Sequence, residues 1–251
     1  MPQRKNRLGQ SIIYGYLPSG VKWLLIANCV IYIVLEAAQR LSANPGAFAH
    51  RRVVWLELSA QMALKGFFVW QFVTYMFLHA GVWHLLMNML TLWMFGVQLE
   101  QTWGTRRFLK YYFLCGIGAG VCVVAINAAI GDWGIPTLGA SGAIFGLLLA
   151  FGVLFPDMTV LMGFLFPLKA KYMVMIYAAV ELYFAFGPNS GVSSVAHLGG
   201  MVVGYIYLQG RLPAVRLPDF GGRYRQWKMQ RAKKKFQVYM RKHDGRGPWV
   251  N

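Results

Sequence analysis

Acidic residues are scarce in this sequence. Its 251 residues include 8 Asp or Glu against 25 Lys or Arg, and charged residues of both signs make up only 13% of the chain. Ordinary soluble domains carry about twice that charged share. The hydrophobic share of 57% and the mean hydropathy of +0.44 are correspondingly high, so the composition argues against an ordinary soluble domain.

Cysteine is scarce too, which excludes a disulfide-stapled architecture. Cys29, Cys115 and Cys122 each lie within an apolar run, and none has a CxxC neighbour or a histidine at metal-ligand spacing. We therefore expect three small buried hydrophobic residues rather than disulfides or metal ligands. No metal and no organic cofactor is expected.

Long apolar runs are what the chain has in abundance. A bilayer-spanning helix needs about 17–25 residues, and six segments come near that length, the fourth and fifth at its short end. They are residues 22–38, 82–99, 108–130, 141–156, 172–187 and 192–209. We therefore predict an all-α polytopic membrane protein with a bundle of six transmembrane helices.

Three parts are expected along the chain. Residues 1–21 form an N-terminal segment, 22–210 the six-helix membrane domain, and 211–251 a basic tail that is either solvated or an amphipathic helix on the membrane. A long outer loop, about residues 39–81, joins the first two spans. It is rich in aromatic residues, and we expect it to be partly helical at the outer leaflet.

Basic residues indicate the orientation. The side of the membrane that holds both termini carries 21 of the 25 Lys and Arg residues, and the other side carries only Arg40, Arg51, Arg52 and Lys65. The positive-inside rule places both termini in the cytoplasm. The compact layout suits a bacterial inner membrane, and the excess of positive charge fits contact with membrane lipids better than nucleic acid.

The first 38 residues partly match a cleaved signal peptide. The "QRKNR" start and the long apolar core favour an uncleaved first helix instead. Cleavage would leave the other five spans oriented as before, so the site prediction does not depend on this choice.

Polar side chains within membrane spans are costly and point to function. His84 and Asn88 are four residues apart and share a helix face, Ser141 opens the fourth span, and His197 lies in the outer part of the sixth. The topology places all four at similar depth. A serine needs a base within hydrogen-bond reach to act as a nucleophile, histidine titrates in the right range, and an amide can donate to an oxyanion.

Glycines favour close approach of the two helices that carry Ser141 and His197. Gly200 and Gly204 form a GxxxG pattern on the sixth span, and Gly142 with Gly146 forms another on the fourth. Small faces of this kind let helix backbones pack closely. Each feature taken alone is more often structural, with Ser141 as a helix cap and Asn88 as a contact between helices.

Together, "HLLMNMLTLWMFG", "LEQTWGTRRFLKYYFLCGIGAG", "GASGAIFG" and "AHLGGMVVGY", in that order, resemble the rhomboid intramembrane serine proteases. The resemblance covers about residues 66–210. It implies a six-helix core around a water-filled cavity that opens to the outside. It also implies cleavage of membrane-protein substrates whose transmembrane segments are locally unwound.

The resemblance assigns roles to the polar residues. It implies Ser141 as nucleophile, His197 as general base, and Asn88 with His84 near the oxyanion. Phe145 is implied to stack on His197, and the glycines of the motifs, Gly139, Gly142, Gly200 and Gly204, are expected to support the geometry.

Two residues stand apart from this pattern. Gln71 lies where the family usually has arginine in the loop before the second span, and an amide replaces only some of the five donors of a guanidinium. Glu181 is a carboxylate deep in the fifth span, and we assign it no role because a Ser/His pair is the simpler arrangement.

Two other functions stay open. A non-proteolytic relative would bind and remodel membrane clients, but such relatives typically lack the Ser or the His. A small-solute or proton transporter would use His84 and His197, although the sequence has no inverted repeat of the kind common in transporters.

Overall fold

The computed structural model describes residues 17–162, 166–186, 192–210 and 229–231. The chain divides into two compact units, residues 1–210 and residues 211–251. The expected basic tail belongs to the second unit and, apart from residues 229–231, lies outside the described residues, as does most of the expected N-terminal segment.

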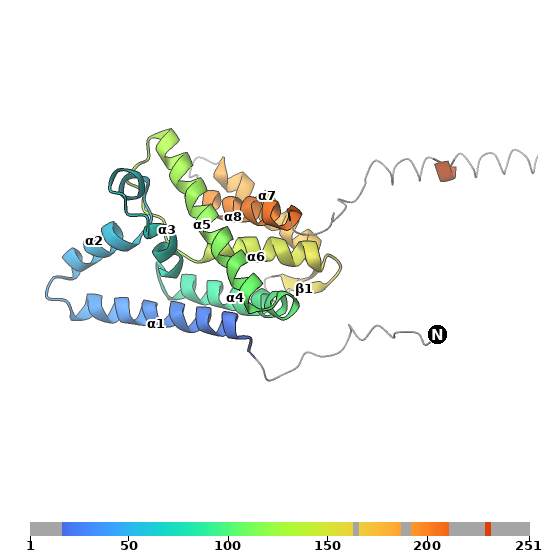
Figure 1. Ribbon diagram of the computed structural model, residues 1–251, viewed down its shortest axis with the longest axis horizontal. Helices are drawn as coiled ribbons and strands as arrows, with labels where there is room; N and C mark the ends of the chain where they lie inside the picture. Colours follow the sequence, from blue (N-terminus) through green and yellow to red (C-terminus); the bar gives the residue numbers. More distant parts are fainter. Residues whose placement is uncertain (1–16, 163–165, 187–191, 211–228, 232–251) are drawn as a thin grey trace, which may run out of the picture. The chain divides into compact units, whose positions relative to one another are not determined.

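Helices make up most of the described part of the first unit (Figure 1). The six longest of them coincide with the six expected apolar segments to within a few residues. They are α1 (Ser19–Leu41), α4 (Val82–Trp103), α5 (Thr105–Ile130), α6 (Ser141–Leu154), α7 (Ala170–Ala185) and α8 (Val192–Gln209).

Length and hydropathy single out three of these helices as able to cross a membrane. They are α1, α4 and α5, while α6 is apolar but only 14 residues long. Trp23 and Ile33 of α1 are each 63% exposed, although both are large and apolar. Such a surface is stable when lipid covers it. The chain is therefore an integral membrane protein, and the count of six crossings stays a prediction.

The segment between α1 and α4 contains short helices, here α2 (Pro45–Leu56), the π-helix η1 (Gln61–Lys65), α3 (Gln71–Thr74) and the 3-10 helix η2 (Tyr75–Phe77). Asn44 caps α2 by accepting a 3.0 Å hydrogen bond from the backbone N–H of Ala47. Pro45 follows at the first helical position, where its missing N–H costs nothing.

Gln71 is fully buried at the start of α3. Its Nε2 donates to the carbonyl of Val54 at 2.8 Å, and its Oε1 accepts from the backbone N–H of Ser59 at 3.4 Å. The amide thus joins α3 to the end of α2 and to the chain that follows. Gln71 therefore ties this segment together although it lacks the charge of an arginine.

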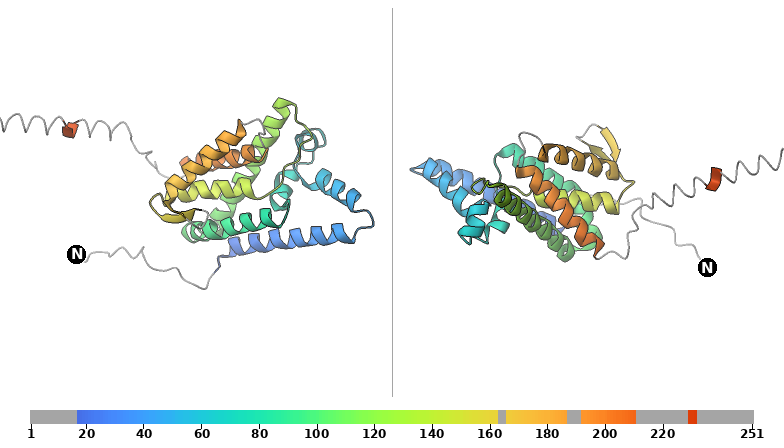
Figure 2. Two further views of the ribbon diagram at one scale, coloured as in Figure 1. Left: turned by 180° about the vertical axis from the view of Figure 1, so that it is seen from behind. Right: turned by 90° about the horizontal axis from the view of Figure 1, so that it is seen from above.

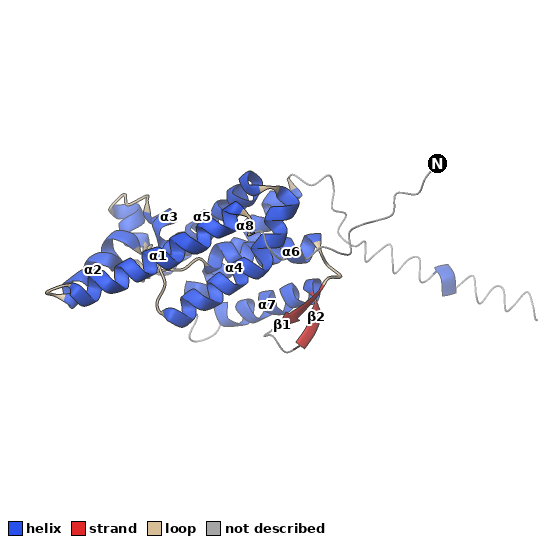
Figure 3. Cartoon of the chain, turned by 90° about the horizontal axis from the view of Figure 1, so that it is seen from below, coloured by secondary structure: helices blue, strands red, loops and turns tan. Residues whose placement is uncertain are grey.

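A β-hairpin between α6 and α7 was not expected from the sequence, which predicts only a connection there. Strands β1 (Thr159–Met162) and β2 (Phe166–Lys169) pair antiparallel, with Thr159 opposite Lys169 (Figure 3). Two strands of four residues, one of which contains a proline, fall below the length at which alternating hydrophobicity can be detected.

Glu100, near the end of α4, anchors the beginning of α1. Its carboxylate accepts from the backbone N–H groups of Gly20 at 2.8 Å and Val21 at 2.7 Å, and from the hydroxyl of Thr105 at 2.6 Å. The first N–H groups of a helix have no partner within the helix, and an anion there also favours the helix dipole. This buried carboxylate therefore caps α1 from a distant part of the chain.

Helix α6 is central in the first unit and packs against α4, α5, α7 and α8 (Figures 1 and 2). Its closest partner is α8, because glycines remove side chains from both surfaces. A methyl group at Gly200 of α8 would collide with the carbonyl of Gly142 of α6, and one at Gly142 would lie 3.3 Å from the carbonyl oxygen of Ala196 of α8. The same glycines also admit α5, because a Cβ at Gly142 would lie 2.7 Å from the Cβ of Ala119 and one at Gly204 would collide with the hydroxyl of Tyr111. The expected close approach of these two helices is therefore present.

Candidate active site

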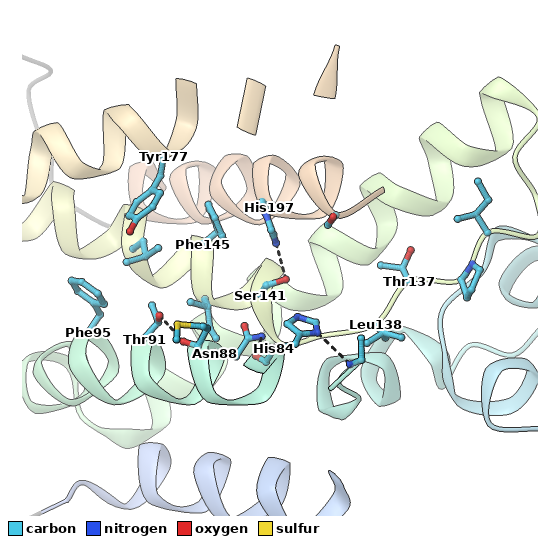
Figure 4. Close-up of a pocket in the computed structure, with 17 residues that line it drawn as sticks. His84, Asn88, Thr91, Phe95, Thr137, Leu138, Ser141, Phe145, Tyr177 and His197 are labelled. Carbon is cyan, nitrogen blue, oxygen red and sulfur yellow. Dashed lines mark hydrogen bonds between the residues drawn. The ribbon is translucent and has the colours of Figure 1, made fainter. Parts of the chain in front are cut away.

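A cavity of about 690 Å³ lies beside the beginning of α6. Helix α4, the loop before α6, and helices α6, α7 and α8 all contribute to its walls (Figure 4). Five of the predicted site residues line it: His84, Asn88, Ser141, Phe145 and His197. Residues from three helices that are far apart in the sequence thus meet at one hollow.

Ser141 is the first residue of α6 and is partly buried. No side-chain hydrogen bond caps the beginning of this helix. Its hydroxyl instead lies 2.8 Å from Nε2 of His197. The N-cap residue is Ala140, so Ser141 does not occupy the capping position that a serine ordinarily takes, and its hydroxyl faces a base.

The ring of His197 is held from one side by Phe145. The two ring centroids are 4.0 Å apart and the planes differ by only 5°, so the rings stack. Phe145 lies one helical turn after Ser141 on the same helix. The stacking implied by the resemblance is present, and it fixes the plane in which the imidazole faces the hydroxyl.

Glu181 contacts the other ring nitrogen of His197, which the sequence analysis did not anticipate. Its Oε1 lies 2.9 Å from Nδ1, and each of the two side chains is 15% exposed. The distance is that of an ion pair, although the N–H direction is not aligned for a straight hydrogen bond. The sequence analysis assigned Glu181 no role, whereas the structure places it in contact with His197.

The spacing of these residues within α7 and α8 explains the contact. Glu181 lies four residues before the end of α7 at Ala185, and His197 lies five residues after α8 begins at Val192. At 1.5 Å of rise per residue, both lie about 6–8 Å from the helix ends that the connecting segment joins. The sequence contained this signal, and the uncertain depth of the fifth span hid it.

Gly139 brings the backbone against His84. It has a φ of +122°, which strongly favours glycine, and a Cβ there would lie 2.9 Å from Cε1 of His84 and 3.6 Å from the hydroxyl of Ser141. Nδ1 of His84 accepts a 3.3 Å hydrogen bond from the backbone N–H of Ala80. The ring is thus held with its Nε2 side toward the loop before Ser141.

Asn88 is buried on α4, one turn after His84. Its side-chain amide donates to the backbone carbonyl of His84 at 2.8 Å. An amide carries two N–H donors, so this contact occupies one of them. Asn88 and His84 both lie on the wall of the cavity across from His197 (Figure 4).

Cys115 is buried, Cys29 and Cys122 are partly buried, and all three are free thiols, as expected. Cys115 packs at the α6 surface, because a Cβ at Gly146 would lie 2.6 Å from its Cβ. These cysteines therefore belong to the packing between helices.

Comparison with known proteins finds one family whose model matches. Residues 67–213 match the rhomboid domain, which is more than half of the chain. The match covers α3 to α8 and includes every predicted site residue.

Individual relatives come from distant organisms. The chain is 34% identical over 150 residues to RHOMBOID-like protein 1 of Arabidopsis thaliana, which is 59% of this chain and 36% of that protein. It is 30% identical over 187 residues to Rhomboid-like protease 3 of Toxoplasma gondii, which is 73% of this chain and 66% of that protein. It is 32% identical over 136 residues to Rhomboid protease GluP of Bacillus subtilis, which is 54% of this chain and 25% of that protein.

The chain thus spans between a quarter and two thirds of the length of these relatives. The shared region is the one that holds the cavity and its polar residues. On the matched domain and these relatives together, the chain belongs to the rhomboid family.

Proposed function

We propose that this protein is an intramembrane serine endopeptidase that hydrolyses peptide bonds in or beside the transmembrane segments of other membrane proteins. The 2.8 Å contact between the Ser141 hydroxyl and Nε2 of His197, on the wall of a cavity, carries the proposal. Membership of a family that includes named proteases supports it.

Ser141 is the nucleophile and His197 the general base. As the Ser141 oxygen attacks the substrate carbonyl, its proton passes to Nε2 of His197. The tetrahedral intermediate then breaks the C–N bond, and His197 gives that proton to the leaving amine. Water, with its proton taken by the same nitrogen, hydrolyses the remaining ester and releases Ser141.

The negative oxygen of the intermediate needs hydrogen-bond donors. The backbone N–H of Ser141 lies at the free beginning of α6, where the helix dipole also favours negative charge. Asn88 has a second amide N–H, and His84 lies beside it on the same wall. One well-placed donor is typically worth about 2.7–4 kcal/mol to the transition state.

Supporting residues keep this arrangement in register. Gly139 admits His84 beside the loop, and Phe145 holds the imidazole plane. Gly142 and Gly200 let α6 and α8 approach, and Gly204 lets α8 approach α5. The chemistry needs no metal and no organic cofactor.

Substrates enter from the membrane as locally unwound segments. A carbonyl within an intact helix is already hydrogen-bonded and shielded, so the chain must open before Ser141 can attack. The cavity gives the reaction a place where water and an extended segment meet within the apolar surroundings. Partners are therefore membrane-protein substrates with unstable transmembrane helices, together with the lipids around them.

We further propose six membrane crossings, with both termini in the cytoplasm and the segment between α1 and α4 at the outer leaflet. The charge distribution supports this orientation. Relatives from a plant, a parasite and a bacterium do not favour a bacterial inner membrane over other membranes.

The test is co-expression with a panel of single-span membrane proteins, read as new cleavage fragments. Ser141→Ala and His197→Ala should remove all fragments while leaving the protein folded, and a fluorophosphonate probe should label the parent protein at Ser141. Cleavage that persists in Ser141→Ala would contradict the assignment. Binding of clients without cleavage would favour a remodelling protein, and solute flux that is unaffected by Ser141→Ala would favour a transporter.

A further inference from the structure

We propose that Glu181 is a positioning residue for His197, so that the site operates as three linked side chains rather than two. The proposal rests on the proposed function. Its basis is that both nitrogens of one imidazole are engaged: Nε2 lies 2.8 Å from the Ser141 hydroxyl, and Nδ1 lies 2.9 Å from Oε1 of Glu181.

The first effect concerns the neutral imidazole. To accept the proton of Ser141 at Nε2, His197 must carry its own proton on Nδ1. A carboxylate beside Nδ1 favours that tautomer, because the N–H then points toward negative charge. The stack with Phe145 restricts the imidazole to one plane, within which the ring can adopt two flipped orientations. Glu181 favours the orientation that places Nδ1 beside the carboxylate and Nε2 beside Ser141.

The second effect concerns the imidazolium that forms when Ser141 attacks. A positive ring is costly in an apolar, partly buried site unless a negative charge lies near it. Both side chains are 15% exposed, so solvent screens their attraction only in part. Glu181 therefore stabilises the positive charge that His197 acquires in the transition state and lacks in the resting enzyme.

The carboxylate is itself held in place. The side chain of Ser194, which is buried on α8 one turn before His197, lies near the Glu181 carboxylate. The imperfect alignment of the Nδ1 contact fits a resting enzyme, since catalytic hydrogen bonds commonly shorten and straighten only when substrate binds.

The other groups around His197 do not supply this charge. Helix α4 presents His84, α6 presents Ser141 and Phe145, and α5 presents Cys122 against Gly199. Among the described residues that face the ring, Glu181 of α7 is the negatively charged one.

The test uses the full-length protein in detergent and measures the rate of fluorophosphonate labelling at Ser141 across a range of pH. The variants are Glu181→Gln, Glu181→Asp and a remote carboxylate control, Asp157→Asn, on an exposed loop. Glu181→Gln should slow the maximal rate about 10-fold to 100-fold, at or below the lower end of general-base effects, because His197 itself remains. Its acid limb should move to lower pH, because the imidazolium has lost its counter-charge.

Glu181→Asp keeps the charge and should recover part of the rate with an acid limb close to the parent profile, while Asp157→Asn should match the parent. If Glu181→Gln does not fold, the profile of Glu181→Asp against the parent decides instead. A parent-like rate and acid limb in the Gln variant would overturn the proposal. So would a loss of rate in both Glu181 variants without movement of the acid limb, since that marks a packing role.

Failure here differs from failure of the proposed function. If Ser141→Ala abolishes labelling and cleavage but Glu181→Gln leaves both unchanged, the proposed protease function is kept and only the proposed role of Glu181 is rejected.

Discussion

At Gly139 the backbone conformation directly affects the positions of the proposed catalytic side chains. Its positive φ and the lack of a side chain let the loop pass His84 on the way to Ser141. Any Cβ at this position is both strained and crowded, and such strain costs about 1–3 kcal/mol. The glycine of the GxSG sequence is thus required by the site rather than by a generic turn.

We therefore predict that Gly139→Ala slows fluorophosphonate labelling of Ser141 at least about 10-fold, because a shift of the nucleophile by an ångström is costly. Gly46→Ala is the matched control, since its Cβ would meet only Asn44 at an ordinary 3.7 Å within α2. Equal labelling of both variants would show that the loop yields without moving Ser141.

His79 gives the protein a dependence on pH outside the proposed spans. It lies in the loop before α4 and is 4% exposed. Burial, and to a smaller degree the nearby His84 ring, lowers the pKa of His79 to about 4, although the nearby Phe77 backbone acts in the opposite direction. The folded protein therefore holds this ring neutral, whereas the unfolded chain protonates it near pH 6.5.

A folded pKa below the unfolded value means that stability is full above about pH 6.5 and is lost as the pH falls toward 4. We predict that His79 alone accounts for about 2–3 kcal/mol of that loss. Thermal unfolding in detergent should show a smaller difference between pH 7 and pH 4 for His79→Gln than for the parent. The same pH dependence in both proteins would contradict this.

At this scale the sequence identified the pair Ser141 and His197 but not Glu181. The pair follows from the motif order and from the expected depth of each helix start. Glu181 lies within a span of uncertain depth, and its contact depends on how α7 turns into α8. The spacing of Glu181 and His197 from their helix ends indicates a similar depth, but the direction of the two side chains is set by tertiary packing.

Among the helices, the contact between α1 and Glu100 joins parts of the chain 80 residues apart. Helix α1 has a largely exposed apolar surface, and only 17% of its most apolar 18-residue stretch is buried in the protein. Its position relative to α4 therefore depends strongly on this one buried carboxylate and on the residues around it.

We predict that Glu100→Gln lowers the free energy of unfolding by about 1–3 kcal/mol, because Gly20 and Val21 donate to different carboxylate oxygens and the amide NH2 that replaces one oxygen would face one of these two N–H groups. The measurement is thermal unfolding in detergent, with proteolysis near the beginning of α1 as a local readout. Glu36→Gln, whose carboxylate makes only a 3.7 Å, one-third-exposed contact with Arg52, should change stability by less than about 0.5 kcal/mol. Similar effects of the two changes would refute the cap.

The long helices were predictable because each is an apolar run bounded by polar or glycine residues. The α6 segment ends two residues before its expected end at Pro156, and α5 starts three residues before its expected start, at Thr105. The hairpin of β1 and β2 was not predictable, since pairing between two four-residue strands depends on the helices that hold their ends.

For the whole molecule, orientation in the membrane is the property that charge decides. Basic residues gather on the side proposed to be cytoplasmic, while the outer segments carry few of them. The proposed orientation therefore follows from the distribution of Lys and Arg along the sequence.

We predict that a cysteine at Gln101 is labelled only from the cytoplasmic side and one at Asp132 only from the opposite side. Both positions are exposed: Gln101 lies in the last turn of α4, just before α5 begins, and Asp132 lies two residues after α5 ends. The three native cysteines are first replaced by alanine, and membrane-impermeant maleimide is applied to sealed vesicles of known orientation. The reverse labelling pattern would invert the whole topology and place the cavity on the other side.

The cap on α1 also imposes an order on biosynthesis. The two N–H groups at the start of α1 have no carboxylate partner until Glu100, 80 residues after Gly20, has been translated. At about 5–20 residues per second, the ribosome needs roughly 4–16 s to reach it. During that interval the first helix is held by lipid alone, free to slide or tilt. Glu100 then joins it to α4, so the first helix receives its cap only after the second long helix has been made.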